Sequence, residues 1–416
     1  GNRLIRTYRP GGMNHPLQRL TLKLARSQMG KVLAEAAKAR QAVADQPNAS
    51  NQIQQILNLA RWAPSGDNTQ PWRFEIISDL HFAIHGRDTR HHCVYDLQGH
   101  ASHLALGALF ETIKIAATGS SMRATISHRA DSPEEKPVFD VHLTHDESIR
   151  PDPLLAWIPS RVTQRRPMKT RKLTAEQIAK LEAAVGPDYR VQWYSSFSQR
   201  LKLARLLFHS AWIRLTIPEA FHVHKNAIQW HVRFSEDRIP DKAVGLDPVA
   251  LFFMRGAMKS WDRVKMLNKY FAGTWLPRIQ LDFMPAMRCA AHAAIVGHKP
   301  AQTMEDYIDV GRAVQRFWLT AASLGLLLQP QTTPGIFSDY ARQELNFSSE
   351  PHALPAAHRI RRGLGKIIGT ESLDNLVFLA RLGVGRTPSS RPTRLSLARL
   401  RQIHDTGSPM EQDPPP

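Results

Sequence analysis

Neutral polar side chains gather in a short loop between a helix-like and a strand-like stretch. The run from Ala63 to Trp72, Ala-Pro-Ser-Gly-Asp-Asn-Thr-Gln-Pro-Trp, holds two prolines and a glycine that fix a loop. Within it, Ser65, Asn68 and Gln70 offer hydrogen-bond donors and acceptors without charge. Such groups on a rigid loop suit recognition of a planar, mostly uncharged ring system. The alternative is a helix-capping turn with Trp72 as a core anchor, and spacing alone does not separate the two.

Arginines cluster in two other parts of the chain. Six basic residues fall between Arg161 and Lys172, and six arginines fall between Val377 and His404, where there is no acid. The guanidinium fork matches phosphate geometry and stays charged, which favours a cofactor-phosphate site. The alternative is that these basic residues lie on a solvated surface and in a tail and hold no ligand. Neither cluster has the aromatic interleaving of a nucleic-acid module, so no nucleic-acid partner is expected.

These patterns together resemble the nitroreductase family of FMN-dependent oxidoreductases. The loop matches the family signature Ala-Pro-Ser-x-x-Asn-x-Gln-Pro-Trp at every fixed position. Weaker matches follow in the family's order. Residues 161–165, Arg-Val-Thr-Gln-Arg, are similar to Arg-x-Ser-x-Arg, residues 311–326 to the long helix and turn of the core, and residues 381–394 to the terminal strand with its phosphate-binding arginine.

The resemblance implies a set of cofactor-binding residues for FMN: Ser65, Asn68, Gln70, Arg161, Thr163, Arg165, Pro330, Gly335, Arg391 and Arg394. In this assignment Arg161, Thr163 and one of the two C-terminal arginines hold the phosphate. Arg165 faces the N1/C2 edge of the flavin, the neutral loop contacts the ring edge or ribityl chain, and the segment 330–335 lies near N5.

The activity that the resemblance implies is hydride transfer from NAD(P)H through the flavin N5 to an electron-poor acceptor such as a quinone or nitro compound. The transfer is of the ping-pong type, and no side chain acts as a nucleophile because the cofactor does the chemistry. The alternative is a non-catalytic protein that binds or sequesters flavin, with residues 216–288 covering the ring.

The order of the motifs departs from that of the short family members, in which the basic Arg-x-Ser-x-Arg element precedes the loop that carries the serine and the asparagine. Here the basic element (161–165) follows that loop (63–72, called the Ser/Asn loop below) by about a hundred residues. The family's flavin sits at a homodimer interface, so we expect a fused pseudo-dimer with one FMN per chain. Both halves lie in one chain, and a monomer would therefore be sufficient.

Periodicity and turn residues predict an α+β, nitroreductase-like fold that is internally duplicated, with mixed or antiparallel sheets flanked by helices. We expect helices over 14–46, 51–62, 100–118, 174–185, 199–215 and 304–323, and strands over 73–77, 122–127, 138–144, 189–194, 290–296, 326–329 and 376–382. The predicted parts are a basic helical extension (1–49), a first half (50–150), a second half (160–400) with an aromatic-rich helical insertion (216–288), and a disordered tail (405–416).

Composition excludes several classes of protein. The chain has 416 residues, is 42% hydrophobic and carries 55 Lys+Arg against 36 Asp+Glu, hence +19, which is globular rather than disordered. No apolar run approaches the ~18 residues that span a bilayer, and no membrane partner is expected. Two cysteines build no disulfide framework, so a reducing, cytoplasmic setting is expected.

The 19 histidines lack carboxylates or cysteines at ligand spacing, and no metal is expected. The basic first forty residues resemble a transit peptide in charge, but we expect no organelle targeting.

Overall fold

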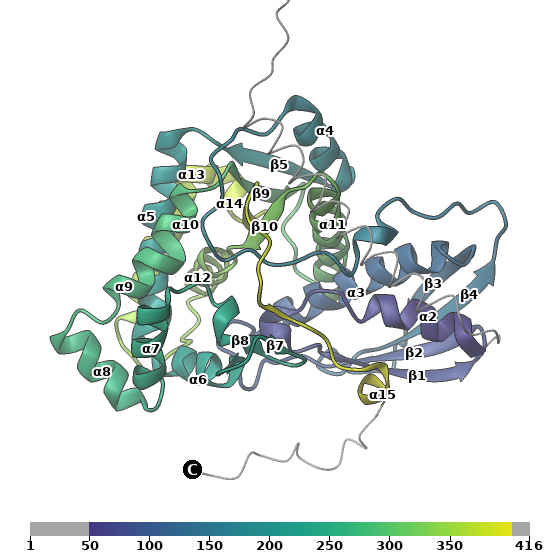
Figure 1. The fold of residues 1–416 in the computed structure, drawn as a ribbon, viewed down its shortest axis with the longest axis horizontal. Coiled ribbons are helices and arrows are strands. Elements are labelled where there is room, and N and C mark those ends of the chain that lie inside the picture. Colours follow the sequence, from purple (N-terminus) through teal and green to yellow (C-terminus); the bar gives the residue numbers. More distant parts are fainter. Residues whose placement is uncertain (1–49, 402–416) are drawn as a thin grey trace, which may run out of the picture. The chain divides into compact units, whose positions relative to one another are not determined.

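The computed structural model describes residues 50–401 and builds them around two four-stranded antiparallel sheets (Figure 1). The first sheet has the order β1-β2-β4-β3. Its strands are β1 (Trp72–Ser78), β2 (His81–Gly86), β3 (Met122–His128) and β4 (Val138–His145). The second sheet has the order β5-β9-β11-β10. Its strands are β5 (Tyr189–Tyr194), β9 (Ala291–Gly297), β10 (Leu327–Pro330) and β11 (Leu376–Gly383).

The two sheets share one arrangement. In each, a helix precedes the first strand, a long helix separates the second strand from the third, and the fourth strand lies between the second and the third. The preceding helices are α2 (Ser50–Ala60) and α4 (Ala175–Ala184), and the long helices are α3 (His100–Thr118) and α11 (Met304–Ser323). The α+β class predicted from the sequence is therefore confirmed.

The helices α3 and α11 pack directly on each other, and two glycines allow their backbones to meet. A Cβ atom added to Gly107 would lie 1.9 Å from the carbonyl oxygen of Ile308, and one added to Gly311 would lie 2.0 Å from that of Leu104. Close to this crossing, Gln315 Nε2 donates to Thr112 Oγ1 at 2.9 Å. The contact joins the two sheets because each helix also packs on its own sheet.

Burial differs between the sheets. In the second sheet, Ala293 and Ile295 of β9 pack in the cluster of α11, whereas the alternating Ala294 and Val296 pack in the cluster of α5 (Phe197–Thr216) and α13 (Ala353–Ile368). Every residue of β9 is consequently buried. The first sheet packs one face against α2 and α3, and its outer face carries exposed residues.

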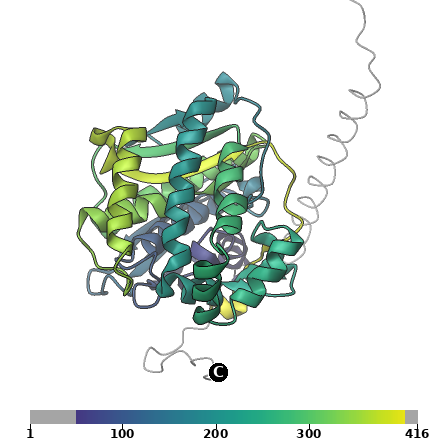
Figure 2. The same ribbon diagram turned by 90° about the vertical axis from the view of Figure 1, so that its left-hand side faces the viewer.

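A mostly helical region, which we call the insertion, lies between β5 and β9, and three short strands also occur there. After α5 come α6 (Pro218–Ala227), α7 (Pro248–Ala257), α8 (Trp261–Tyr270), α9 (Trp275–Pro277), the π-helical η4 (Arg278–Phe283) and α10 (Met284–Met287). The short strands are β6 (Ile228–Gln229), β7 (Phe234–Ser235) and β8 (Ile239–Pro240), and the 3-10 turn η3 is Asp241–Ala243. Figure 2 shows this green and teal region on one side of the described chain.

The C-terminal segment returns from the second sheet to the first half. The strand β12 (Arg391–Pro392) pairs in parallel with β7 of the insertion, and Leu395 and Leu400 join the core under the first sheet. The short helix α15 (Leu397–Leu400) ends the described chain. Residues that follow β11 in sequence are thereby brought against the Ser/Asn loop.

Most predicted elements are confirmed. The long helices α3 and α11 and the strand β5 have the expected bounds, and Thr174 forms a capping box with Gln177 at the start of α4. The sequence analysis did not identify β2, α12 (Thr333–Arg342), α13 or α14 (Thr370–Leu373), nor the 3-10 turns η1 (Gly66–Asn68) and η2 (Leu155–Trp157). The predicted helix over 14–46 and the predicted tail over 405–416 lie outside the described residues.

Candidate functional site

A cavity of about 650 Å³ lies where three parts of the chain meet: the Ser/Asn loop, the segment that contains Arg161, Thr163 and Arg165 (the basic segment), and the start of α12. We call it the arginine cavity. Eight of the ten residues proposed for FMN line it: Ser65, Asn68, Arg161, Thr163, Arg165, Pro330, Gly335 and Arg394. Loops some 100 to 330 residues apart in the sequence are thus brought to one place, as the motif order requires.

The Ser/Asn loop holds an unusual backbone conformation. Asp67, Asn68 and Gln70 have φ angles of 47°, 66° and 48°, in the left-handed region that non-glycine residues rarely adopt. Such strain persists only where surrounding contacts impose it, and it concentrates at functional sites. Here the Gln70 backbone N–H donates to Ser65 Oγ at 2.9 Å, and Thr69 Oγ1 donates to the Gly66 carbonyl at 3.0 Å.

Two amide side chains tie this loop to distant segments. Asn68 Nδ2 donates to the Glu236 carbonyl of the insertion at 2.9 Å, while its buried Oδ1 has no hydrogen-bond partner among the described residues. Gln70 Nε2 donates to the same carbonyl at 2.8 Å, and Gln70 Oε1 accepts from the Leu395 backbone N–H at 2.9 Å. The Gln70 side chain is fully buried and does not line the cavity, so in this structure it holds the loop in place.

The basic segment is anchored to the second sheet. Thr163 forms a bridge with Leu328 of β10, and the Gln164 N–H donates to the Leu328 carbonyl at 3.0 Å. From β11, the fully buried Arg381 donates to the Gln164 carbonyl at 2.9 Å and to the Arg166 carbonyl at 3.1 Å. These bonds fix the backbone from which the flanking arginines project.

Guanidinium groups converge around Trp62, beside the arginine cavity. Arg161 donates to the Trp62 carbonyl at 2.9 Å, Arg394 to the Ala63 carbonyl at 3.1 Å, and Arg391 to the Pro159 carbonyl at 2.9 Å. Neither Arg161 nor Arg394 forms an ion pair with a carboxylate among residues 50–401. The buried Arg161 Nε also has no partner there. Arg391 does not itself line the cavity, and its guanidinium lies 4.8 Å from the Trp62 ring.

The electrostatic cost of this cluster appears in its pKa values. Burial lowers the pKa of Arg161 well below its usual value, and the neighbouring Arg394 and Arg391 lower it further. Burial, with Arg391 and Arg61 nearby, lowers the pKa of Arg394 to about 9. Buried like charges without counter-charges are destabilising unless an anion completes the site. The cluster is therefore suited to a phosphate or a similar anion.

The segment after β10 leads directly into a helix. Pro330 is the last residue of β10 and Gly335 is the third residue of α12, because Thr333-Pro334-Gly335 forms the first turn of that helix. Proline is tolerated in the first helical turn, where its missing N–H has no partner anyway. Both residues still line the arginine cavity.

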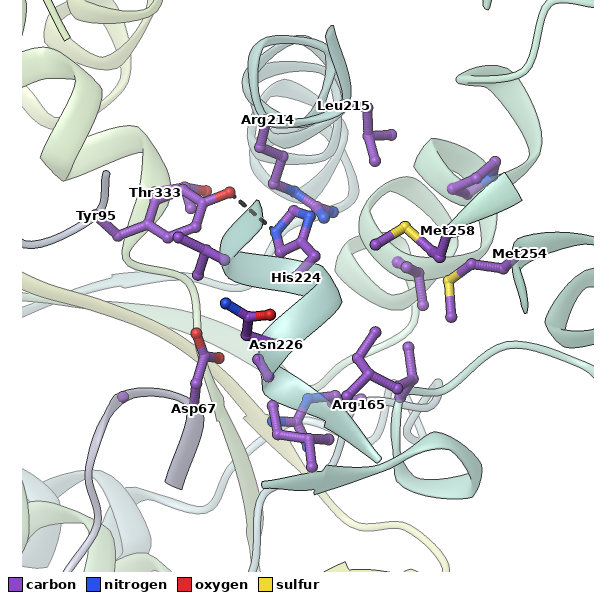
Figure 3. Close-up of a pocket in the computed structure, with 18 of the residues that line it drawn as sticks. Asp67, Tyr95, Arg165, Arg214, Leu215, His224, Asn226, Met254, Met258 and Thr333 are labelled. Carbon is purple, nitrogen blue, oxygen red and sulfur yellow. Dashed lines mark hydrogen bonds between the residues drawn. The ribbon is translucent and has the colours of Figure 1, made fainter. Parts of the chain in front are cut away.

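A second cavity, of about 870 Å³, adjoins the first beneath the helical insertion, and we call it the insertion cavity (Figure 3). Asp67, Tyr95 and Arg165 line both cavities, so the two spaces meet at these side chains. Apolar residues of α7, α8 and the following turn line much of its far side, among them Met254, Met258, Leu267, Phe271 and Leu276. Thioether side chains are flexible and adapt to differently shaped ligands.

The polar groups at the junction are buried. The Tyr95 hydroxyl lies 2.9 Å from His224 Nε2. The dashed line in Figure 3 marks this contact. Burial lowers the pKa of His224 to about 3, so the ring is neutral, and burial raises the pKa of Tyr95. Arg214 is paired with Asp282 at 2.5 Å. Burial also raises the pKa of Asp67, which the Arg165 charge opposes.

Tyr95, His224, Arg214 and Asp282 are not among the site residues that the sequence analysis proposed. Asp96, next to Tyr95, supports the start of α3, because its carboxylate accepts from the Ala101 N–H at 2.7 Å. No local pattern could have distinguished Tyr95, since its partner His224 lies 129 residues away in the insertion. Within residues 50–401, no group of three or more His, Cys, Asp or Glu could hold a metal ion.

Residues 39–111, which include the Ser/Asn loop and most of α3, match the nitroreductase family. Seven chains of known structure also match. One is a nitroreductase with bound FMN from Bacteroides fragilis, at 12% identity over 63% of this chain and 100% of that one, with a TM-score of 0.30. Another is the FMN-dependent nitroreductase NfnB from Mycobacterium smegmatis in complex with NADPH, at 15% identity over 60% and 96%, with a TM-score of 0.32. No curated protein matches the chain.

Proposed function

We propose that the chain is an FMN-dependent oxidoreductase that takes hydride from NAD(P)H and passes it to an electron-poor acceptor by a ping-pong mechanism. The observation that supports this most is the pair of buried arginines, Arg161 and Arg394, which line the same cavity as the neutral side chains of Ser65 and Asn68. FMN combines a phosphate, which suits the arginines, with an uncharged ring and ribityl chain, which suit the neutral groups. The family match of the Ser/Asn loop supports the same cofactor.

The residues present fit FMN. The unpaired Arg161 Nε and the adjacent Arg394 provide donors for a phosphate, and the unpaired Asn68 Oδ1 provides an acceptor for a ring N–H or a ribityl hydroxyl. The cavity volume of about 650 Å³ is within the range of small-molecule sites. The bound flavin would supply hydride acceptance and donation at N5. Arg165, at the junction, would place positive charge beside the ring, where reduction adds negative charge.

The insertion cavity supports turnover over storage. A ping-pong enzyme needs a space beside the cofactor that first admits the nicotinamide and then the acceptor, and this cavity opens onto the arginine cavity at Asp67, Tyr95 and Arg165. Its walls are largely apolar, which suits an aromatic acceptor such as a quinone or a nitro compound. The neutral Tyr95–His224 pair would present a hydroxyl to a carbonyl or nitro oxygen.

The alternative, flavin sequestration, is favoured by one observation. The insertion reaches over the loop, with the Glu236 carbonyl bonded to both Asn68 and Gln70 and with Ile239 lining the arginine cavity. A cover of this kind could exclude the nicotinamide. The two proposals share the cofactor and differ only in access to it.

We also propose that the two halves, 50–150 and 160–400, arose by duplication of one nitroreductase-like unit, with a single FMN site between them. The shared strand order supports this, as does the direct packing of the two equivalent long helices. A Ser/Asn loop occurs in the first half, and the basic segment with the C-terminal arginines in the second, so each half contributes one side of one site.

Titration with FMN and anaerobic stopped-flow mixing test the proposal. We expect one FMN per chain, bleaching of the flavin by NADPH or NADH, and steady-state oxidation of the nicotinamide with menadione. Flavin that only dithionite reduces would support sequestration instead. A chain that binds no FMN would contradict both proposals.

A further inference from the structure

Exposed apolar side chains concentrate in one part of the insertion. Fourteen large hydrophobic residues are exposed among residues 50–401, and ten of them fall between 249 and 284: Val249, Phe252, Phe253, Met266, Tyr270, Phe271, Trp275, Leu276, Ile279 and Met284. Phe253 is 64% and Phe271 is 69% exposed. Single exposed hydrophobics are ordinary, whereas a concentration of this kind marks an interaction surface.

These residues come from consecutive short helices, and we call residues 248–279 the insertion cap. On α7, Val249, Phe252 and Phe253 follow helical spacing and so share one face. On α8, Met266 and Tyr270 lie four residues apart and are therefore neighbours on the exposed side. In Figure 1, α7, α8 and α9 lie together at the lower left, away from both sheets.

The same cap is basic. Residues 248–279 contain six basic residues, of which Arg278 is buried. The other five (Arg255, Lys259, Arg263, Lys265 and Lys269) against one acid (Asp262) give 5 − 1 = +4 outside the interior. Cations also accompany the exposed rings: Arg255 lies 5.6 Å from the Phe252 ring and Lys269 lies 5.0 Å from the Tyr270 ring. The occupant of this face must therefore accept aromatic side chains and carry negative charge.

We propose that the insertion cap docks on the surface of an anionic lipid bilayer, with Phe252, Phe253 and Phe271 among the headgroups. Aromatic rings beside lysines and arginines suit the interface between water and acyl chains, where rings lie at the headgroup level and basic residues meet anionic lipids. A second copy of the chain fits less well, because a symmetric contact would oppose two patches of charge +4.

Docking on a membrane surface does not require a helix that spans the membrane. No helix within residues 50–401 is both long and apolar enough to cross a membrane. The expectation that no membrane partner exists came from the search for a spanning segment, and a surface patch assembled from separate short helices is invisible to that search.

The docked face would also surround the entrance of the insertion cavity. Phe253, Phe271 and Leu276 are exposed and at the same time line that cavity. A lipid surface against these residues would allow an apolar compound to pass from the bilayer into the cavity. This one consequence rests on the proposed function, whereas the docking itself does not.

Vesicle co-sedimentation of the full chain tests the docking. We expect binding to phosphatidylglycerol–phosphatidylcholine vesicles, weakened by salt, and at least tenfold weaker binding to phosphatidylcholine alone. The variant F252S/F253S/F271S should bind at least tenfold more weakly than the parent chain. The matched control is F197S at the start of α5, where a phenylalanine is 66% exposed outside the cap, and it should bind like the parent.

A charge variant keeps the test decisive if the triple variant does not fold. Lys265 and Lys269 are both exposed on α8, and K265E/K269E should lose the preference for anionic vesicles. In addition, vesicles with brominated acyl chains should quench the tryptophan fluorescence of W275F less than that of the parent chain, because Trp275 is one of the exposed residues of the cap.

Three outcomes would overturn the docking proposal. They are absence of binding to anionic vesicles, equal loss of binding in F197S, and a parent dimer that the triple variant converts to a monomer without any vesicle binding. FMN content and reduction by NADPH, measured on the same samples without vesicles, report separately on the proposed function.

Discussion

At the scale of single residues, Arg161 and Arg394 carry the strongest argument for an anion. Both are buried, and both donate only to backbone carbonyls among the hydrogen bonds described. Burial lowers the pKa of each, Arg391 lowers both further, and Arg394 also lowers the pKa of Arg161. A protein without a ligand gains nothing from such a cluster, because burial of an uncompensated charge costs several kcal/mol. The cluster is understandable if a ligand supplies the negative charge.

The substitution R161Q tests this role. Hydrogen bonds to charged groups contribute about 1.5–3 kcal/mol, so FMN should bind about tenfold to a hundredfold more weakly. Riboflavin, which lacks the phosphate, should bind the variant and the parent chain equally. Fluorescence titration with both flavins measures the difference.

The control for this prediction is R401Q. Arg401 is exposed and lies outside both cavities, so its loss removes the same charge from the molecule without changing the site. Equal weakening of FMN and riboflavin in R161Q, or equal effects in R161Q and R401Q, would contradict the assignment of Arg161 to the phosphate.

Much of the arginine cavity was predictable from residues, and the insertion cavity was not. Ser65, Asn68, Arg161 and Arg165 stand in local motifs, and such motifs can be read without knowing the fold. Tyr95 and His224 meet only because α6 packs beside the segment before α3, a long-range contact that no spacing records. Gln70 stands in the same motif as Asn68, yet its amide supports the loop, a distinction that only burial reveals.

At the scale of elements, the crossing of α3 and α11 determines how the two sheets are joined. Each helix was predicted with its observed bounds, because both combine strong helical periodicity with a clear end. The position of the crossing was not predictable, since a glycine within a helix pattern ordinarily reads as a weakness. Here the backbones of the two helices meet at Gly107 and Gly311.

The elements that the sequence analysis missed have physical explanations. β2 lies between β1 and β4, and its three consecutive buried residues Phe82, Ala83 and Ile84 obscure the alternation of polar and apolar residues that marks a strand. α12 begins with Thr333-Pro334-Gly335, which has the composition of a turn, and α13 contains Pro355, Gly363 and Gly365. Tertiary packing outweighs such local signals.

Alanine at the crossing should be strongly destabilising. In G311A the new Cβ would lie 2.0 Å from the Leu104 carbonyl oxygen, so the helices must separate. We expect the free energy of unfolding to fall by about 3 kcal/mol or more. G256A is the matched control: it places the same substitution inside α7, where nothing lies within 4 Å of the added Cβ.

The two variants should change stability in opposite directions. Alanine is a better helix former than glycine by about 0.8–1 kcal/mol, so G256A should be as stable as the parent chain or slightly more stable. Urea unfolding followed by circular dichroism measures both. A G311A variant as stable as the parent would show that α3 and α11 do not approach as closely as described.

At the scale of the whole molecule, buried neutral histidines make the fold sensitive to acid. Burial lowers the pKa of His100 to about 4, of His224 to about 3 and of His292 to about 4. They occur at the start of α3, in the insertion and in β9, so the effect is spread over the structure rather than confined to the site.

The direction of the effect follows from proton linkage. In the unfolded chain these rings bind protons below a pKa near 6.5, whereas in the folded chain they stay neutral until the pH approaches 4 or lower. Between these values the unfolded state binds more protons, so stability falls as the pH falls. The carboxylate of Asp306, whose pKa hydrogen bonds lower to about 2, adds a loss of stability only below about pH 4.

Urea unfolding at pH 7.5, 6.0 and 5.0 should therefore show a progressive loss of stability well before the carboxylates titrate. Each buried histidine contributes a slope of up to about 1.4 kcal/mol per pH unit in this window. H100Q should flatten the dependence by about one proton, because glutamine does not titrate. H91Q is the matched control and should leave the dependence unchanged, since the His91 side chain is 76% exposed. A dependence that is identical in H100Q and the parent chain would mean that His100 is charged, or open to water, in the folded protein.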